Sequence, residues 1–231
     1  TKFGSFGLTF DGSNDLVNVS NRTFLDITGP ITIEAWIKPR TVDDDAIVVK
    51  GTSPGTNNDA YVLGITTTSR LILRFGNGVG NQDLQGNSTI QTDVWSHVAG
   101  TYDKNTMRVY VNGKEDNSTA YSANLRINNE SVKIGAYTQG ISHFRGEIDE
   151  VAIWNVSLSS DIIYEHYQKG WGYYNTSNFT SQVFDANRTV NWSYVSWQTA
   201  NNYQQDLSSL VNASTVLYMK FDNSTGETER P

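Results

Sequence analysis

Three acidic residues close together are the strongest candidates for catalysis in this sequence. Glu147, Asp149 and Glu150 lie within four consecutive residues, and retaining glycosidases cleave sugars with two carboxylates about 5–5.5 Å apart. The alternation of side chains along a strand, however, directs Glu147 and Glu150 to opposite faces of the sheet. These two carboxylates therefore cannot act on one glycosidic bond, which argues against a glycosidase.

The other residue types that perform catalysis are missing or poorly spaced. The three histidines, His97, His143 and His166, fall on a predicted strand, loop and helix without the spacing of a metal site. The chain has no cysteine, and no serine stands in a Gly-x-Ser-x-Gly turn. The sequence therefore predicts a protein that is not an enzyme.

A turn near the N-terminus is rich in oxygen atoms that could bind a metal ion. Asp11, Asn14 and Asp15 follow one another within five residues, and Ca²⁺ takes 6–8 oxygen ligands, including carboxylates and amides. In the alternative interpretation, Asp11 and Asn14 only satisfy the backbone of their own turn. Residue types alone leave both interpretations open. A structural Ca²⁺ is the only cofactor that the sequence indicates.

Composition excludes several classes of partner. The chain has 17 Lys and Arg against 24 Asp and Glu, a formal net charge of −7, so nucleic acid and anionic membranes have no electrostatic reason to bind. The lack of cysteine excludes disulfides. No apolar run approaches the roughly 18 residues of a membrane span. We expect no membrane insertion of this segment and a secretion signal that lies outside it.

Asparagine is followed two positions later by Ser or Thr more often than chance predicts. The chain has 23 Asn, and Ser and Thr make up 46 of its 231 residues, so roughly five Asn-x-Ser/Thr acceptor triplets are expected. It has twelve, none with Pro in the middle. Polar loops form some triplets by accident, but the excess predicts a heavily N-glycosylated protein. The acceptors are Asn18, Asn21, Asn87, Asn117, Asn129, Asn155, Asn175, Asn178, Asn187, Asn191, Asn212 and Asn223.

The elements that position these residues are mostly short strands. Residues 31–38 alternate, with Ile31, Ile33, Ala35 and Ile37 on one face. Further strands follow at intervals of roughly 8–12 residues, separated by Asp/Asn/Gly/Ser turns, and Asn112-Gly113 is a type I′ hairpin signal. This pattern predicts an all-β fold, an antiparallel sandwich rather than a parallel α/β sheet.

One helix and a C-terminal extension complete the predicted organisation. Apolar and aromatic residues recur at helical spacing after Asp161, and Gly170 follows as a C-cap, which indicates a helix of about eleven residues. Residues 171–231 hold six of the twelve acceptor triplets and few charges. We expect a domain over residues 1–170 and a small β extension or connector over residues 171–231.

Several segments together resemble the laminin-G-like jelly-roll domains of the concanavalin A-like lectin/glucanase superfamily. They occur in the family's order over residues 3–170, and the resemblance implies two antiparallel sheets stacked as a jelly roll. The superfamily contains enzymes, lectins and adhesive spacers, so the fold does not name the function. The segments are Phe10–Val17, Ile31–Pro39, Trp95–Asp103, Met107–Gly113, Val132–Gly135, Arg145–Trp154 and the helix Leu158–Tyr167.

The resemblance bears on both the carboxylates and the calcium ligands. Laminarinase-like members carry Glu-x-Asp-x-Glu on one strand, whereas this chain has Val151 and Ala152 where the last Glu would be. Family members often bind one structural Ca²⁺ between an Asp of the first turn and an Asp of a late strand. The resemblance therefore implies a site formed by Asp11, Asn14 and Asp149, with Asp15 as a further ligand.

The family's opening strand has its counterpart at the C-terminal end of this chain. Residues 216–226 match the family pattern of an apolar strand ending in Phe-Asp and followed by Ser-Thr-Gly. Either the chain is one period of a tandem array, or strand 215–221 completes a neighbouring copy; a chance match is the third alternative. The residues of this candidate assembly strand are Val216, Leu217, Tyr218, Met219, Lys220 and Phe221.

Two functions remain. The first is a non-enzymatic extracellular structural protein, an N-glycosylated surface or filament repeat that assembles with copies of itself by tandem packing or strand exchange. Dense acceptor triplets without cysteine favour an archaeal cell surface. The alternative is a carbohydrate-binding lectin or adhesin module that binds external carbohydrate. Its aromatic platform would come from Trp171, Tyr173, Tyr174, Trp192 and Trp197, although such residues more often belong to a core.

Overall fold

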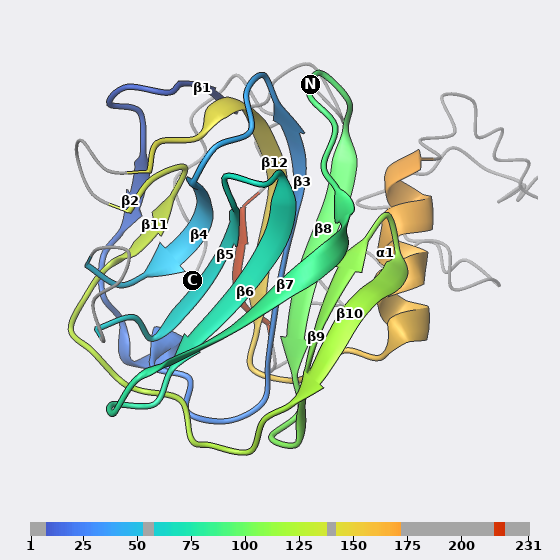
Figure 1. Cartoon of the computed structure of the whole chain (residues 1–231). Helices are drawn as coiled ribbons and strands as arrows, with labels where there is room; N and C mark the ends of the chain where they lie inside the picture. The colour runs from blue at the N-terminus through green and yellow to red at the C-terminus, as the bar shows by residue number, and fades with distance from the viewer. Residues whose placement is uncertain (1–7, 53–57, 138–141, 172–214, 220–231) are drawn as a thin grey trace, which may run out of the picture.

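The computed structural model describes residues 8–52, 58–137, 142–171 and 215–219 and shows two antiparallel β-sheets packed face to face (Figure 1). This confirms the predicted all-β jelly-roll sandwich with one short helix. No helix among these residues is long and apolar enough to cross a membrane. A short 3₁₀ helix, η1 (Thr23–Leu25), lies between strands β2 (Val17–Val19) and β3 (Ile31–Pro39).

The seven-stranded sheet has the order β1-β12-β3-β8-β9-β10, with β13 also paired to β12. The six-stranded sheet has the order β2-β11-β4-β5-β6-β7. The seven strands of the first sheet are β1 (Leu8–Asp11), β3 (Ile31–Pro39), β8 (Ser96–Tyr102), β9 (Thr106–Val111), β10 (Lys114–Ala120), β12 (Arg145–Trp154) and β13 (Thr215–Met219). Those of the second are β2 (Val17–Val19), β4 (Asp45–Lys50), β5 (Tyr61–Ile65), β6 (Arg70–Gly76), β7 (Asn81–Thr89) and β11 (Val132–Ile134).

The core lies between the sheets and is formed by alternate residues of the strands. Ile33 and Ile37 of β3 meet Leu63, Leu73 and Phe75 of the six-stranded sheet in one hydrophobic cluster, and all five are fully buried. Burial of apolar side chains of this size contributes roughly 1.5–3 kcal/mol each. The period-two pattern of the sequence therefore selects the face of each strand that enters the core.

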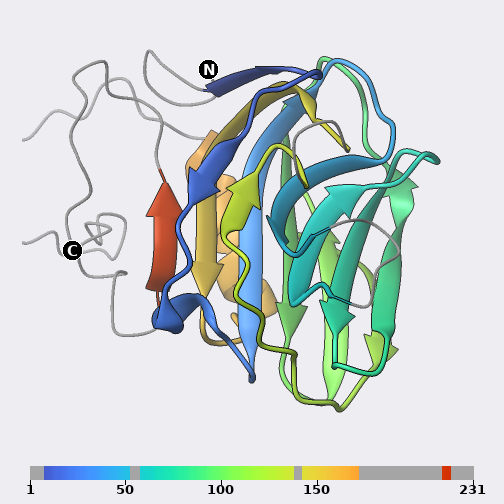
Figure 2. The same ribbon diagram turned by 90° about the vertical axis from the view of Figure 1, so that its left-hand side faces the viewer.

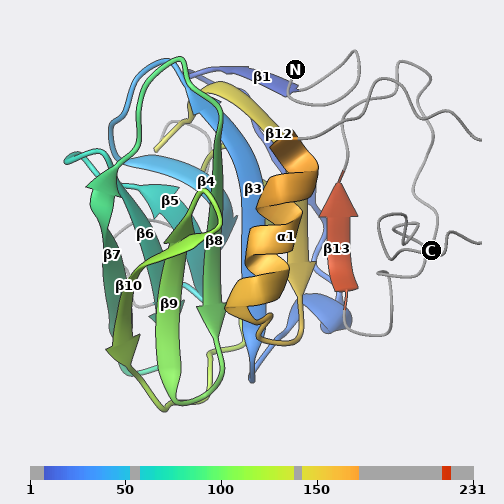
Figure 3. The same ribbon diagram turned by 90° about the vertical axis from the view of Figure 1, so that its right-hand side faces the viewer.

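Helix α1 (Ser160–Trp171) covers the outer face of the seven-stranded sheet (Figure 3). Ile163 is fully buried against Ala99 and Tyr110, whereas its neighbour Ile162 is exposed. Because the helix covers this face, β3 is buried on both sides along almost its whole length. Thr32 and Glu34, polar positions of the alternating strand, are therefore buried as well.

The acidic segment of β12 does not follow the simple alternation that the sequence predicts. A β-bulge falls between Asp149 and Ala152, and Glu150 adopts a positive φ of 50°. Ile148 and Val151 both face the core as a result, so counting by twos fails across Glu150. Glu147 instead forms an ion pair with Lys38 on β3, with 3.1 Å between Nζ and Oε1.

The predicted assembly strand forms, but it pairs within its own chain. β13 runs antiparallel to β12 and continues the edge that β1 begins (Figure 2). Leu217 packs against the core, while Lys220 and Phe221 lie outside the described residues. The structure therefore does not show the donated arrangement that strand exchange requires, and exchange stays a prediction.

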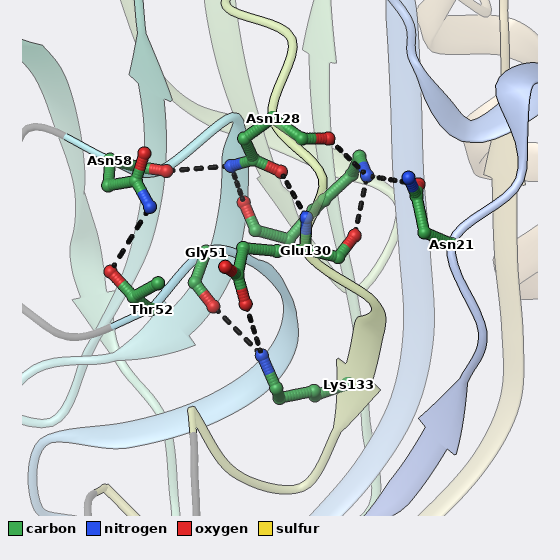
Figure 4. Close-up of polar contacts among 8 residues, drawn as sticks. Asn21, Gly51, Thr52, Asn58, Asn128, Glu130 and Lys133 are labelled. Atoms are coloured by element: carbon green, nitrogen blue, oxygen red, sulfur yellow. Dashed lines mark hydrogen bonds and ion pairs between the residues drawn. The ribbon is translucent and has the colours of Figure 1, made fainter.

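A buried ammonium group ties loops to the end of β4. The Lys50 side chain is fully buried, and its Nζ donates to Asn21 Oδ1 at 2.8 Å and to the carbonyl oxygens of Asn128 and Glu130 at 3.1 and 2.6 Å (Figure 4). Asp26 Oδ1 lies 3.2 Å from the same nitrogen. Four oxygens from two connections, β2–β3 and β10–β11, thus converge on one ammonium group.

Candidate functional site

The outer face of the six-stranded sheet is a candidate surface for binding. Among the described elements, α1 covers the opposite sheet and none lies across this face (Figures 1 and 3). Lys133 of β11, Val49 of β4 and Val62 of β5 belong to it, as do Arg74 of β6 and Asp83 of β7, because their neighbours along each strand enter the core. Ligand-binding surfaces commonly combine apolar positions with a few fixed polar groups.

Arg74 is the centre of the polar group on this face. Its guanidinium donates from Nε to Asp83 Oδ1 at 2.6 Å and from a second nitrogen to Oδ2 at 2.7 Å. This bidentate arrangement fixes the orientation of the guanidinium relative to the carboxylate. The remaining nitrogen donates to the Tyr137 hydroxyl at 3.3 Å and lies 3.7 Å from Asp59 Oδ2. We call Arg74, Asp83, Asp59 and Tyr137 the Arg74 cluster.

Local structure explains why these residues meet. Arg74 and Asp83 are direct cross-strand partners in the β6–β7 register, the arrangement in which opposite charges interact best. Asp59 precedes β5 and fits because of two glycines: a Cβ on Gly76 would collide with the Asp59 carbonyl oxygen, and one on Gly51 would collide with its Oδ1. The only signals for this site in the sequence are the two successive strand segments that pair as β6 and β7 and these two glycines. None of its residues was predicted from the sequence.

Charge and burial set the protonation of the cluster. Burial raises the pKa of Asp59 to about 6, although the nearby Arg74 charge counteracts part of that rise. Burial also raises the pKa of Tyr137 far above its ordinary value, so its hydroxyl keeps its proton. Near neutral pH the phenol is therefore neutral, while the Asp59 carboxylate, ionised above about pH 6, adds a negative charge beside the Arg74–Asp83 pair. Such groups hydrogen-bond hydroxyls well, but none of them is an activated nucleophile.

An apolar floor lies beside the polar groups. Tyr137 packs with Ala46, Val49 and Val62 in a small cluster of its own, separate from the main core. All four are at most 4% exposed, so the parts of this region that a ligand could reach are the Arg74 and Asp83 side chains, at 17% and 39% exposed.

A second group of titratable residues lies under α1. Glu34 Oε1 accepts hydrogen bonds from Trp154 Nε1 at 3.0 Å and from His166 Nδ1 at 2.9 Å, and Oε2 lies 3.4 Å from His97 Nε2. Burial alone would raise the pKa of Glu34, but His166 and His97 outweigh it and hold the pKa well below its ordinary value. Glu34 is only 5% exposed, so this group fastens the helix and offers no surface to a ligand.

The predicted calcium ligands are only partly brought together. Asp11 Oδ1 accepts hydrogen bonds from the backbone N–H groups of Ser13 and Asn14, and Asp15 Oδ2 accepts one from the Asp11 N–H. These bonds match the alternative interpretation, in which the turn satisfies its own backbone. Asp11 is paired with Arg145, four positions along β12 from Asp149, which corresponds to about 13 Å along a strand.

No group of three or more His, Asp or Glu residues that could hold a metal ion occurs in the described ranges. Ca²⁺ also uses amide and backbone oxygens as ligands. Calcium binding therefore stays a prediction.

The remaining predicted residues divide between the described ranges and the rest of the chain. The Trp171 side chain and residues 173, 174, 192 and 197 of the predicted aromatic platform lie outside the described residues. So do six acceptors: Asn175, Asn178, Asn187, Asn191, Asn212 and Asn223. The six described acceptors are all at least partly exposed, and they are Asn18, Asn21, Asn87, Asn117, Asn129 and Asn155.

Sequence comparison identifies the fold family. A family model described as the concanavalin A-like lectin/glucanases superfamily matches residues 11–164. No curated protein matches the chain significantly.

Solved structures share the fold at low sequence identity. The CBM40 domain of a Ruminococcus gnavus sialidase, bound to α2,3-sialyllactose, is 17% identical, with a TM-score of 0.59 over 72% of this chain and 99% of its own. Domain 4 of an extracellular arabinanase from Geobacillus stearothermophilus, in complex with arabinotriose, is 18% identical, with a TM-score of 0.50 over 69% of this chain and 88% of its own.

A third structure is longer than this chain. A candidate carbohydrate-binding protein from Bacteroides ovatus is 20% identical, with a TM-score of 0.53 over 68% of this chain. The match spans only 47% of that protein, so about half of the larger chain has no counterpart here.

Proposed function

Because the chain belongs to the concanavalin A-like lectin/glucanases superfamily, we propose that it is a carbohydrate-binding module and that the Arg74 cluster is its binding site. The observation that carries this proposal is the bidentate Arg74–Asp83 pair, held beside Tyr137 on a sheet face that no described element crosses. The carbohydrate-binding domains among the structural neighbours support it. They favour the lectin alternative over the filament hypothesis.

The electrostatics of the site favour a neutral sugar. Asp83 compensates the charge of Arg74 at 2.6 and 2.7 Å, so little positive charge remains for a carboxylate. The formal net charge of −7 also opposes an acidic ligand. The ligand class that fits is an uncharged oligosaccharide whose hydroxyl groups contact the Arg74 guanidinium and the Asp83 carboxylate, the two exposed members of the cluster.

Replacing Arg74 with Ala should abolish most of this binding. We expect affinity for the preferred glycan to fall at least about tenfold, because a hydrogen bond to a charged group contributes about 1.5–3 kcal/mol. The measurement is a glycan array that contains neutral and sialylated sugars, followed by calorimetry with the best ligand. Asp83→Asn, which keeps the shape of the side chain, should weaken binding less.

The matched control is Arg108→Ala. Arg108 forms a similar ion pair with Asp103, at 2.7 Å, but lies on β9 in the other sheet. We expect it to bind like the unchanged protein, and circular dichroism should show that all variants are folded. Equal affinity in the Arg74 and Arg108 variants, or an array without any bound sugar, would overturn the proposal.

The remaining predictions complete the proposed function. We place the module outside the cell, on the strength of the twelve acceptor triplets and of the extracellular arabinanase among its structural neighbours. Assembly into a filament remains a second hypothesis, which negative-stain imaging of native material would test.

Calcium, if it binds at Asp11, Asn14 and Asp15, should raise the melting temperature. EDTA should then reverse the rise, because a ligand that binds only the folded state stabilises it. Asp11→Asn should remove the response to calcium. A melting temperature that is unaffected by calcium and by EDTA would eliminate the site.

A further inference from the structure

Three of the described acceptor asparagines lie on strands at the edges of the two sheets. Asn18 is the middle residue of β2, Asn87 lies in β7 and Asn117 lies in β10. β2 and β7 are the two ends of the six-stranded sheet, and β10 is one end of the seven-stranded sheet. The eight interior strands, all within the described residues, contain no acceptor.

Edge strands are the places where a β-sandwich is most exposed to association. An edge presents backbone N–H and C=O groups with which another chain can pair. Proteins commonly block such edges with charges, bulges or covering segments. A bulky hydrophilic group on the edge strand would block pairing in the same way.

The edge strands β7 and β10 already form some of each other's backbone hydrogen bonds through side chains. Asp116 lies at a bulge in β10, and its carboxylate accepts hydrogen bonds from the backbone N–H groups of Asn87 and Ser88 on β7, at 2.7 and 3.0 Å. The Asn117 amide donates back to the Gln85 carbonyl oxygen at 2.7 Å. β7 and β10 thus close one side of the sandwich through side chains and not through a continuous ladder.

The two acceptor amides at this seam keep a hydrogen for modification. Asn87 Nδ2 donates one hydrogen bond, to the Asp116 carbonyl oxygen at 2.7 Å, and Asn117 Nδ2 donates one to Gln85. An amide nitrogen carries two hydrogens, so each has one that is not used in these bonds. Both asparagines are at least partly exposed, and Asn18 is exposed.

We propose that N-linked oligosaccharides on Asn18, Asn87 and Asn117 cover the edge strands β2, β7 and β10 and keep copies of the sandwich from pairing edge to edge. In the transfer, the amide nitrogen bonds to the anomeric carbon of a lipid-phosphate-linked oligosaccharide. The bond from that carbon to the phosphate oxygen breaks, and the amide proton passes to a base of the transferase. This inference rests on the extracellular location given under the proposed function, but not on sugar binding by the Arg74 cluster.

The test removes acceptors without touching the asparagines. In a host that performs N-glycosylation, the whole chain is produced unchanged and with Ser20→Ala, Thr89→Ala and Thr119→Ala together, which destroy the three edge triplets. The control carries Ser131→Ala and Ser157→Ala, which destroy the triplets of Asn129 and Asn155 in the loops. Peptide mass spectrometry measures occupancy, and size-exclusion chromatography with light scattering measures association.

We expect glycans on all three edge asparagines in the unchanged protein. The edge variant should self-associate at a protein concentration at least about tenfold lower than the unchanged protein or the loop control. Empty edge sites beside occupied loop sites would overturn the modification. Occupied edge sites whose removal leaves the protein monomeric would overturn the shielding role. Neither readout depends on a glycan ligand, so failure of sugar binding is scored separately on the array.

Discussion

Replacing Lys50 with Met should lower the free energy of unfolding by about 3–5 kcal/mol. Whole domains are stable by only about 5–15 kcal/mol, so this single change should remove a large part of the stability. The Lys50 ammonium is fully buried, and four oxygens lie within 3.2 Å of it. Without its charge, these oxygens face one another with no donor between them.

The cost arises from the partners that remain. Asp26 keeps a carboxylate whose side chain is only 18% exposed, and the carbonyl groups of Asn128 and Glu130 lose a charged donor. A buried acceptor that cannot reach water loses its full solvation. The Met side chain fills a similar volume, so the measured change reports charge and hydrogen bonding and not a cavity.

The measurement is urea denaturation followed by tryptophan fluorescence, with Lys38→Met as the matched control. Lys38 also forms one ion pair, with Glu147, but its side chain is 32% exposed, and such pairs contribute about 0–1 kcal/mol. Similar losses of unfolding free energy in both variants would show that the four oxygens around the Lys50 ammonium have no special energetic role. A Lys50→Met protein too unstable to purify would agree with the prediction only if Lys38→Met folds normally.

Replacing Glu34 with Gln should lower the free energy of unfolding by about 3 kcal/mol. Gln keeps the size of the side chain, but it has no charge and offers one acceptor oxygen where the carboxylate offers two. Trp154, His166 and His97 all converge on that carboxylate. Because His166 belongs to α1, the loss should loosen the helix from the seven-stranded sheet.

The pH dependence of this effect follows from the direction of the pKa shift. The folded-state pKa of Glu34 lies below its ordinary value of 4.5, so the folded protein holds the proton less tightly than the unfolded chain. The stabilisation is therefore complete above pH 4.5 and declines as the pH falls towards the folded-state pKa. The titratable groups that face Glu34 are His97 from β8 and His166 from α1.

Chemical denaturation at several pH values tests both the size of the stability loss in Glu34→Gln and the direction of its pH dependence. The difference between the unchanged protein and Glu34→Gln should be largest near neutral pH and should shrink below pH 4.5. Glu115→Gln is the control, because this exposed carboxylate has only a 3.6 Å ion pair with Arg108, and it should cost less than about 1 kcal/mol. A difference that grows in acid would contradict the assignment.

The strand pattern and the helix were predictable because both depend on local periodicity. Apolar residues at every second position of β3 mark the face that enters the core, and the spacing of Ile163, His166 and Tyr167 marks the face of α1 that meets the sheet. The same local signals supported the resemblance to the superfamily. The family match over residues 11–164 confirms that resemblance.

The sequence pattern alone did not predict burial where segments distant in the chain pack against each other. The alternation places Glu34 and Trp36 on the face opposite the core, but α1 arrives some 130 positions later and buries them, with the rings of Trp36 and Tyr167 stacked at 5.9 Å between centroids. The bulge at Glu150, with its positive φ, shows in the pairing of β12 with β3 and not in the residue types of the strand.

The sequence by itself determined the sandwich, the absence of disulfides and the positions of the acceptor triplets, since each is a property of neighbouring residues. Only the tertiary structure decided which polar residues meet. Arg74 reaches Asp83 and Asp59 through the pairing of β6 with β7 and through two glycines, and β13 joins β12 across more than sixty positions. Charge, burial and hydrogen bonding act through space, so the candidate site exists only after the strands have paired.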